Sequence, residues 1–292
     1  MFPVHNCHSG VECKQKRARP DNDGSPPVPS KRRQQLLTSV FTVVPKTPKA
    51  ARGKICVAKY FPGKPLPKTP GFYNVFIHTT NSNLGGELSP FVLKDEKGHL
   101  LENVWQFSKV YAYVNAQCIK LSRFHPRVII WEHPKEVHVD DGKVLPAYWK
   151  WREKGMNNHY AVRYPNGYHG RHQCLYSLWP RNDGSGEFEK LSYIEARKKI
   201  YCGEYVRFAP QTAHFRKLQA MLAGGTNLQI IEVDGPDFRL NFPPYDQLSE
   251  QNPGLLITAG IIKMLVNDSR KPFGHGYVVA ALLLNGAEWL KE

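Results

Sequence analysis

Apolar and polar positions along the chain predict a mixture of strands and helices from residue 54 onwards. Runs of β-branched and aromatic residues, bounded by Pro and Gly, predict strands near 54–60 and 72–79. The apolar run RVIIWE over 127–132 predicts a buried strand, and the alternation over 227–233 predicts another.

Helical spacing and capping residues predict helices in most of the other apolar segments. The longest of these helices is expected over 101–121. A capping box beginning at Ser192 opens a second helix, and 212–223 forms a third that the following glycine pair closes. A further helix is expected over 255–266, whereas 277–290 is apolar enough to be buried but fits either type. This mixture indicates the α+β fold class.

Residues 1–53 differ in composition from the rest of the chain. The net charge of the 292 residues is +15, and residues 1–54 hold eleven Lys and Arg against three acidic residues. This part is rich in Pro, Ser and Gln and has few periodic apolar residues, so it cannot bury enough surface to offset its ordering entropy. We therefore expect a disordered basic arm over 1–53.

Basic residues in the arm form clusters at 14–19 and 31–33, spaced like a bipartite nuclear-import signal. They predict an intracellular protein that resides in the nucleus. Lys and Arg on such an arm also bind DNA or RNA backbones by counterion release, without choosing a sequence. The alternative is a solvated tail that binds nothing specific.

No apolar stretch reaches the length of about 18 residues that a membrane span needs, and the best candidate, 255–266, contains Lys263. We therefore expect a soluble protein without a membrane partner. The first ten residues lack the pattern of a signal peptide. The cysteines are scattered and form no C-x-x-C pair, as is usual in a reducing compartment.

A candidate site lies in the expected helix over 101–121. Steps of four and three residues put Glu102, Gln106 and Lys109 on one helix face, with Trp105 beside them as a flat wall. A carboxylate can activate water and stabilise an oxocarbenium-like sugar, an ammonium can neutralise phosphate, and an indole can stack on a base. The alternative is an ordinary amphipathic helix with a charged face and Trp105 in the core.

Three blocks of sequence together resemble a known family. In the first, a Ser-Pro-Phe element and a charged turn precede an E-x-x-aromatic-Q-x-x-K pattern, formed by Ser89, Pro90, Phe91, Glu102, Trp105, Gln106 and Lys109. The second block, 195–234, contains helical segments and then a strand that ends in acidic residues. The third is PFGHGY at 272–277. In this order the blocks resemble the NADAR superfamily, although Phe273 stands where that family usually has tryptophan.

The resemblance implies a single, mainly helical NADAR-like domain over 54–292, interrupted by a loop-rich insertion at 134–182. It also implies an N-glycosidase acting on an ADP-ribose or phosphoribosyl substrate, including ADP-ribose on guanine in nucleic acid. Glu102 would be the catalytic residue, with no cofactor. The alternative is a non-catalytic module that binds ADP-ribose or nucleic acid in the same pocket.

Further candidate residues for substrate binding follow from the later blocks. Glu232 or Asp234 can supply a second carboxylate at the end of a strand, although each is equally suited to a turn. Gly274 and Gly276 flank a histidine in a tight turn that would let backbone approach phosphate or ribose. Together with Ser89 and Phe91, these residues complete the expected binding site.

The inserted segment carries two further patterns. His169, His172 and Cys174 are metal-ligand types, but no second pair completes a zinc site, so we expect a polar loop and no metal. Tyrosines and tryptophans over 148–176 alternate with Lys and Arg, which is the combination that binds single-stranded nucleic acid. The same aromatic residues are equally suited to building a core.

Overall fold

The computed structural model describes residues 53–77, 85–122 and 125–290. The expected basic arm and its two clusters, apart from Gly53, lie outside the described residues. Within the described part the fold is α+β, as the sequence predicts.

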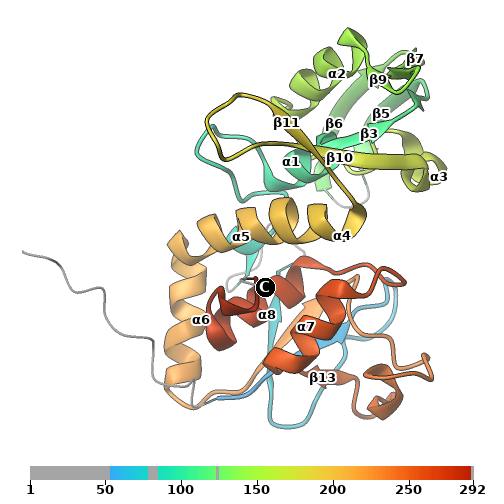
Figure 1. Ribbon diagram of the computed structural model, residues 1–292. Coiled ribbons are helices and arrows are strands. Elements are labelled where there is room, and N and C mark those ends of the chain that lie inside the picture. The colour runs from blue at the N-terminus through green and yellow to red at the C-terminus, as the bar shows by residue number, and fades with distance from the viewer. Residues whose placement is uncertain (1–52, 78–84, 123–124, 291–292) are drawn as a thin grey trace, which may run out of the picture. The chain divides into compact units, whose positions relative to one another are not determined.

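Helices are distributed along the whole described chain (Figure 1). The α-helices are α1 (Leu101–Phe107), α2 (Pro146–Met156), α3 (Gly167–Gly170), α4 (Tyr193–Ala196), α5 (Gly203–Phe208), α6 (Ala213–Ala223), α7 (Ala259–Asn267) and α8 (His275–Asn285). A π-helical stretch, η3 (Arg197–Cys202), joins α4 to α5. Short 3₁₀ turns are η1 (Gly86–Leu88), η2 (Arg171–Gln173), η4 (Ala209–Gln211), η5 (Tyr245–Gln247) and η6 (Glu288–Leu290).

Strands form one four-stranded sheet and several smaller ones. They are β1 (Ile55–Lys59), β2 (Tyr73–Phe76), β3 (Lys109–Tyr111), β4 (Tyr113–Val114), β5 (Gln117–Ser122), β6 (His125–His133), β7 (Glu136–Val137), β8 (Val139–Asp140), β9 (Lys143–Val144), β10 (Cys174–Pro180), β11 (Phe188–Leu191), β12 (Leu228–Glu232) and β13 (Gly254–Leu256). The predicted strands at 54–60, 127–132 and 227–233 are confirmed by β1, β6 and β12, and the described part of 72–79 contains β2.

The four-stranded sheet has the order β13-β1-β12-β2. β12 is central, pairs in parallel with both β1 and β2, and has every residue buried, while β13 runs antiparallel to β1. Burial along nearly the whole of β1 and β12 explains why these two strands are mostly apolar. The parallel pairing also brings the carboxyl ends of β1, β12 and β2 to the same edge.

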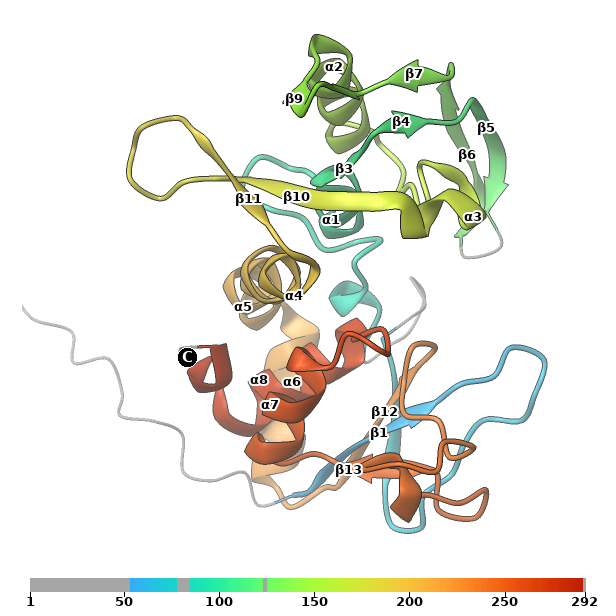
Figure 2. The same cartoon turned by 45° about the vertical axis from the view of Figure 1, so that its right-hand side comes forward.

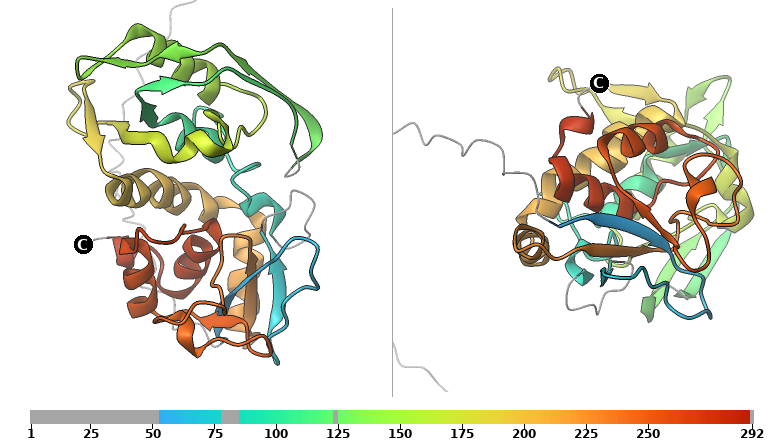
Figure 3. Two further views of the ribbon diagram at one scale, coloured as in Figure 1. Left: turned by 90° about the vertical axis from the view of Figure 1, so that its right-hand side faces the viewer. Right: turned by 90° about the horizontal axis from the view of Figure 1, so that it is seen from below.

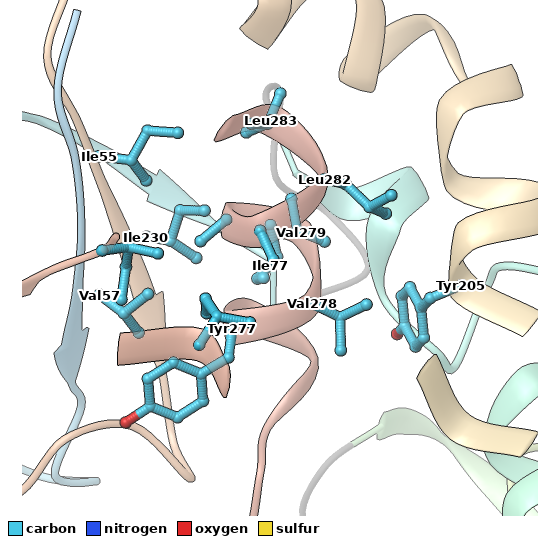
Figure 4. Close-up of a cluster of buried hydrophobic side chains, with 14 of the residues drawn as sticks. Ile55, Val57, Ile77, Tyr205, Ile230, Tyr277, Val278, Val279, Leu282 and Leu283 are labelled. Atoms are coloured by element: carbon cyan, nitrogen blue, oxygen red, sulfur yellow. The ribbon is translucent and has the colours of Figure 1, made fainter. Parts of the chain in front are cut away.

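Helix α8 packs against this sheet and forms the centre of the larger core (Figure 4). Val278, Val279 and Leu282 on the helix lie with Ile55 and Ile230 from the strands. The segment 277–290, whose type the sequence leaves open, is helical as α8 up to Asn285 and ends in the 3₁₀ turn η6. All residues of α8 from His275 to Leu283 are buried.

A second core lies around α1 and α2, in the part of the chain that Figure 2 shows beside β10. Phe107 contacts Trp131 and Trp151, with ring centroids 4.8 and 4.6 Å apart. The segment 134–182, expected to be rich in loops, contains α2 and the long strand β10 and supplies Trp151 to this core. That expectation is corrected, because the aromatic residues of the segment pack with those of α1, β3 and β6 in this second core.

The expected long helix over 101–121 is also corrected. Helix α1 ends at Phe107, and the chain continues as β3, which pairs antiparallel with β10. Residues after Ser108 are largely β-branched or aromatic, as in KVYAYV, and favour a strand once a partner strand is available. Lys109 therefore lies on a strand.

Capping residues are the most accurate local signals. Ser192 accepts a hydrogen bond from the Glu195 amide in a complete capping box, and Thr212 caps α6 in the same way. In the expected helix 255–266, Thr258 caps α7 and separates it from β13. That prediction is correct for its second part only.

The helical run α4-η3-α5 connects the two cores and is visible along its length in Figure 3. Its buried Arg197 donates to carbonyls in the last turn of α7 and just after the helix, at 3.2 Å from Leu265, 2.8 Å from Asp268 and 2.9 Å from Lys271. Four carbonyl partners, including Val266, fix the end of α7 on this run. Among the described residues, no helix has the length and apolarity needed to cross a membrane.

Candidate functional site

The candidate site begins at the carboxyl end of the central strand β12. Glu232, its last residue, is buried and accepts hydrogen bonds from the amides of Asp234 at 3.1 Å and Gly276 at 2.8 Å. Nδ1 of His275 lies 3.1 Å from the Glu232 Oε2, while its Nε2 lies 3.0 Å from the Ile77 carbonyl. The Glu232 carboxylate therefore faces the positive end of helix α8 and an imidazole.

Gly274 and Gly276 are required by this carboxylate. A Cβ at Gly274 would lie 2.6 Å from the Glu232 Cδ, and one at Gly276 would lie 2.9 Å from the Glu232 Cβ. A close approach of the glycine turn does occur, and the group that it approaches is the Glu232 side chain. Phe273, at the position of the family tryptophan, is buried and stacks on Tyr277 at 5.2 Å.

Glu102, the expected catalytic residue, lies in the first turn of α1. Only 6% of it is exposed, its backbone amide donates to the Pro90 carbonyl at 3.0 Å, and its Oε1 accepts from Gln106 Nε2 at 2.8 Å. Among the described residues, no group donates a hydrogen bond to its Oε2. One carboxylate oxygen is therefore held in place and the other is uncommitted.

Gln106 passes this chain of hydrogen bonds on to Lys109. Its Oε1 accepts from Lys109 Nζ at 3.0 Å, so the three side chains expected on one face do connect, although Lys109 lies on β3. Burial lowers the pKa of Lys109, and the nearby Glu102 carboxylate opposes that shift in part.

Trp105 forms a wall beside Lys109. Lys109 Nζ lies 4.6 Å from the centroid of its ring, and Tyr193 and Tyr201 from the helical run lie 6.3 and 5.3 Å away. The indole is partly buried in this aromatic setting. Trp105 thus joins α1 to the helical run, and its role in base stacking stays a prediction.

Ser89 and Phe91 shape the approach to α1. Ser89 is fully buried, its Oγ accepts from the Phe91 amide at 3.3 Å, and its carbonyl accepts from Val92 and Leu93 at 2.9 Å. These bonds form the turn that delivers Pro90 to Glu102. Ser89 is therefore a turn residue, and Phe91 is partly buried beside it.

Arg163 belongs to the basic and aromatic pattern over 148–176, but its place in this site was not predicted from the sequence. Its Nη2 lies 3.1 Å from the Asp234 Oδ2, which joins the inserted segment to the end of β12. Burial lowers the pKa of Arg163. The charges of Glu102, Asp234 and other nearby acidic groups raise this pKa by a larger amount, so its net shift is upward. Burial raises the pKa of Asp234, with Glu232 adding to the rise and Arg163 opposing it.

Asn103 brings Arg163 to the site. Its side chain is buried, accepts from the Val162 amide at 2.8 Å, and donates to the carbonyls of Asn158 and Tyr160 at 3.0 Å. The residue next to Glu102 therefore anchors the segment that ends in Arg163. Nothing in the spacing of 59 residues between Asn103 and Val162 signals this interaction.

The three sequence blocks meet at this place. The Tyr205 hydroxyl from the second block donates at 3.3 Å to the carbonyl of Leu88, which directly precedes the first block, and its ring stacks on His275 of the third at 6.1 Å. Burial raises the pKa of Tyr205, and the charges of Glu232 and Glu102 add to that rise. Both carboxylates thus act on one side chain.

Other predicted groups do not join the site. Among the described residues, no three His, Cys, Asp or Glu side chains gather as metal ligands, so His169, His172 and Cys174 do not form such a group.

Comparisons with family models, curated proteins and solved structures found no match to this chain.

Proposed function

We propose that this protein is an N-glycosidase of the NADAR type, which hydrolyses the bond between a ribose and a nitrogen atom in an ADP-ribose or phosphoribosyl substrate. The observation that carries the proposal is the setting of Glu102: a buried carboxylate with one oxygen held by Gln106 and the other uncommitted. The meeting of the three NADAR-like blocks around it supports the same assignment.

The proposed reaction adds water to the anomeric carbon while the carbon–nitrogen bond breaks. Glu102 would accept a proton from the water through its uncommitted oxygen and stabilise the positive charge that develops on the sugar. The departing base would take up a proton. Gln106, held by Lys109 and in turn holding Glu102, would keep the carboxylate oriented.

Arg163 and Lys109 are suited to the anionic part of the substrate. Both are cationic groups withdrawn from water, where a phosphate is bound more strongly than at an exposed surface. Glu232 has a different role in this proposal, because both of its oxygens already accept backbone hydrogen bonds. It would position α8 and leave proton transfer to Glu102.

The test is hydrolysis of ADP-ribosylated guanine in single-stranded DNA by wild type and Glu102→Gln, with released ADP-ribose as the readout. We expect the variant to be slower by about 10²–10⁴-fold, the usual contribution of a general base. Its affinity for ADP-ribose should stay within a few fold, because the amide keeps the shape of the side chain. Glu153→Gln, at an exposed position on α2, is the matched control and should retain full activity.

The binding module remains the competing function. If wild type releases no ADP-ribose but binds it, and Glu102→Gln changes only the affinity, the pocket is a binding site and the glycosidase proposal is wrong. Release at equal rates by wild type and Glu102→Gln would instead remove Glu102 from the mechanism.

A further inference from the structure

The segment that carries Arg163 continues into a group of stacked arginine and tyrosine side chains. We name Arg163, Tyr164, Tyr168 and Arg171 the Arg–Tyr ridge. The Arg163 guanidinium lies 4.9 Å from the Tyr164 ring centroid, and that of Arg171 lies 5.7 Å from Tyr164 and 3.5 Å from Tyr168. The two tyrosine rings meet edge to face at 5.3 Å.

This ridge is held in a defined shape by buried hydrogen bonds. Asn166 is 1% exposed, and its side chain accepts from the Asn115 amide at 2.7 Å and donates to the Gly170 carbonyl at 3.4 Å. A Cβ at Gly170 would lie 2.9 Å from the Asn166 side chain, so the turn requires glycine there. The ridge is therefore built before any ligand arrives, which lowers the entropic cost of binding.

The backbone conformation of Tyr164 also indicates that the ridge has a fixed shape. Tyr164 has a φ of +61°, in the left-handed region that a residue with a Cβ rarely adopts. The Gly167 amide donates to the Tyr164 carbonyl at 2.8 Å and closes the turn. A residue stays in such a strained conformation only where the surrounding structure holds it there, and such residues are common at ligand-binding positions.

Charge and exposure distinguish the ridge from a core. Tyr168 is 51% exposed, and the neighbouring His169 and His172 are exposed too. Residues 154–182 contain no Asp or Glu at all. An exposed aromatic ring with a stacked guanidinium, in a stretch without acidic residues, offers both a stacking plane and a partner for phosphate.

The ridge is continuous with the candidate site. Arg163 at one end pairs with Asp234, and the charges of Asp234 and Glu102 both act on the Tyr164 hydroxyl. Arg163 therefore belongs both to the ridge and to the candidate site.

We propose that the Arg–Tyr ridge binds single-stranded nucleic acid, so that the substrate of the site is a modified base within a strand and not a free nucleotide. Unpaired bases are required, because only they present a face for stacking on Tyr168. The position of the reacting base rests on the proposed function, whereas strand binding by the ridge does not.

Fluorescence anisotropy of the full chain with labelled 12-mers of single-stranded DNA, single-stranded RNA and duplex DNA tests this inference. Tyr168→Ala and Arg171→Ala should each weaken the binding of single strands about ten-fold, the usual loss for one base–aromatic stack. Tyr168→Phe keeps the aromatic ring and should bind single strands like wild type. Tyr73→Ala is the matched control, because Tyr73 is 50% exposed on β2, and Arg216→Ala on α6 is the control for charge. The two single-stranded arms decide whether DNA or RNA is preferred.

Equal affinity of wild type and the two ridge variants would overturn the inference, and so would an equal loss on duplex DNA, which would indicate backbone charge alone. A loss of the same size in Tyr73→Ala would also contradict it. Glu102→Gln should bind strands like wild type. If the ridge variants lose binding while wild type shows no hydrolysis, the ridge stands and the glycosidase proposal fails.

Discussion

Three carboxylates of the candidate site differ in what their oxygens contact. Glu232 is held by backbone amides, Asp234 is paired with Arg163, and Glu102 has a single side-chain partner. Proton transfer needs a carboxylate oxygen that is not already engaged, which separates Glu102 from Glu232, both of whose oxygens accept from backbone amides. Asp234 differs from Glu102 by its ion pair with Arg163. The chemical group is the same at each position, so the partners alone separate the roles.

A buried histidine outside the site provides a test of pH dependence. His138 is fully buried, and neither of its ring nitrogens has a hydrogen-bond partner among the described residues. Its Nε2 lies 3.8 Å from the Glu136 Oε2, beyond hydrogen-bond distance. Burial, and then the nearby His133, lower the pKa of His138 from 6.5 to about 4. The unfolded chain therefore binds a proton more readily than the folded protein between these values.

Stability from His138 is present above pH 6.5 and is lost as pH falls toward 4, by about 3 kcal/mol in total. We expect His138→Phe, of similar volume, to remove this part of the acid sensitivity. The measurement is the free energy of unfolding in urea between pH 7 and 4. His159→Phe at an exposed position is the control, and an unchanged pH profile in His138→Phe would refute the assignment.

At the scale of elements, the first turn of α8 is fitted to the end of β12. The carboxylate of Glu232 takes the space that side chains at Gly274 and Gly276 would need. β12 and α8 are thus in close contact because the glycines at the start of α8 leave room for the Glu232 side chain. Glycine is used here for close packing, since Gly274 has an ordinary φ of −69°.

Alanine substitutions at the start of α8 and at the start of α7 distinguish the effect of close packing on stability from the effect of helix propensity. We expect Gly274→Ala to lower the free energy of unfolding by about 1–3 kcal/mol, the usual cost of overpacking. Gly260→Ala in the first turn of α7, where the nearest atom to a new Cβ lies 4.0 Å away, should raise it by about 0.5–1 kcal/mol. Urea unfolding of both variants measures this, and a change of the same sign in both would argue against the packing role.

Local sequence predicted most element types and failed where a distant partner decides. The capping box predicted at Ser192 was correct because a cap depends on residues three positions apart. The helix predicted after Ser108 was wrong because these residues form β3 by pairing with β10, which lies more than 60 residues further along the chain. Helical spacing could not reveal that pairing.

At the scale of the molecule, the charge of the chain is unevenly divided. Residues 1–54 carry eleven Lys and Arg, and the ridge adds arginines at a defined surface. The two would contribute differently to nucleic-acid binding, because the arm offers charge alone and the ridge offers charge with stacking.

Deleting residues 1–52 should therefore weaken strand binding and reduce its salt dependence. The slope of log K against log salt should fall by about 0.7 for each phosphate that the arm neutralises in the full chain. The measurement is anisotropy with a single-stranded 12-mer between 50 and 200 mM salt. Replacing Lys31, Arg32 and Arg33 with Ala in the full chain should give a smaller change in the same direction. An unchanged slope after deletion would exclude the arm from binding, and nuclear import would stay a separate prediction.

The sequence by itself determined the α+β class, the starts of α1, α4 and α6, and the connected set Glu102, Gln106 and Lys109, because those features depend on neighbours within a few residues. Tertiary structure alone decided that Asn103 anchors the segment leading to Arg163, that Arg163 pairs with Asp234, and that the glycine turn packs on Glu232. Each of these interactions joins residues tens of positions apart, and only the packed cores bring them together, so no local pattern carries their signal.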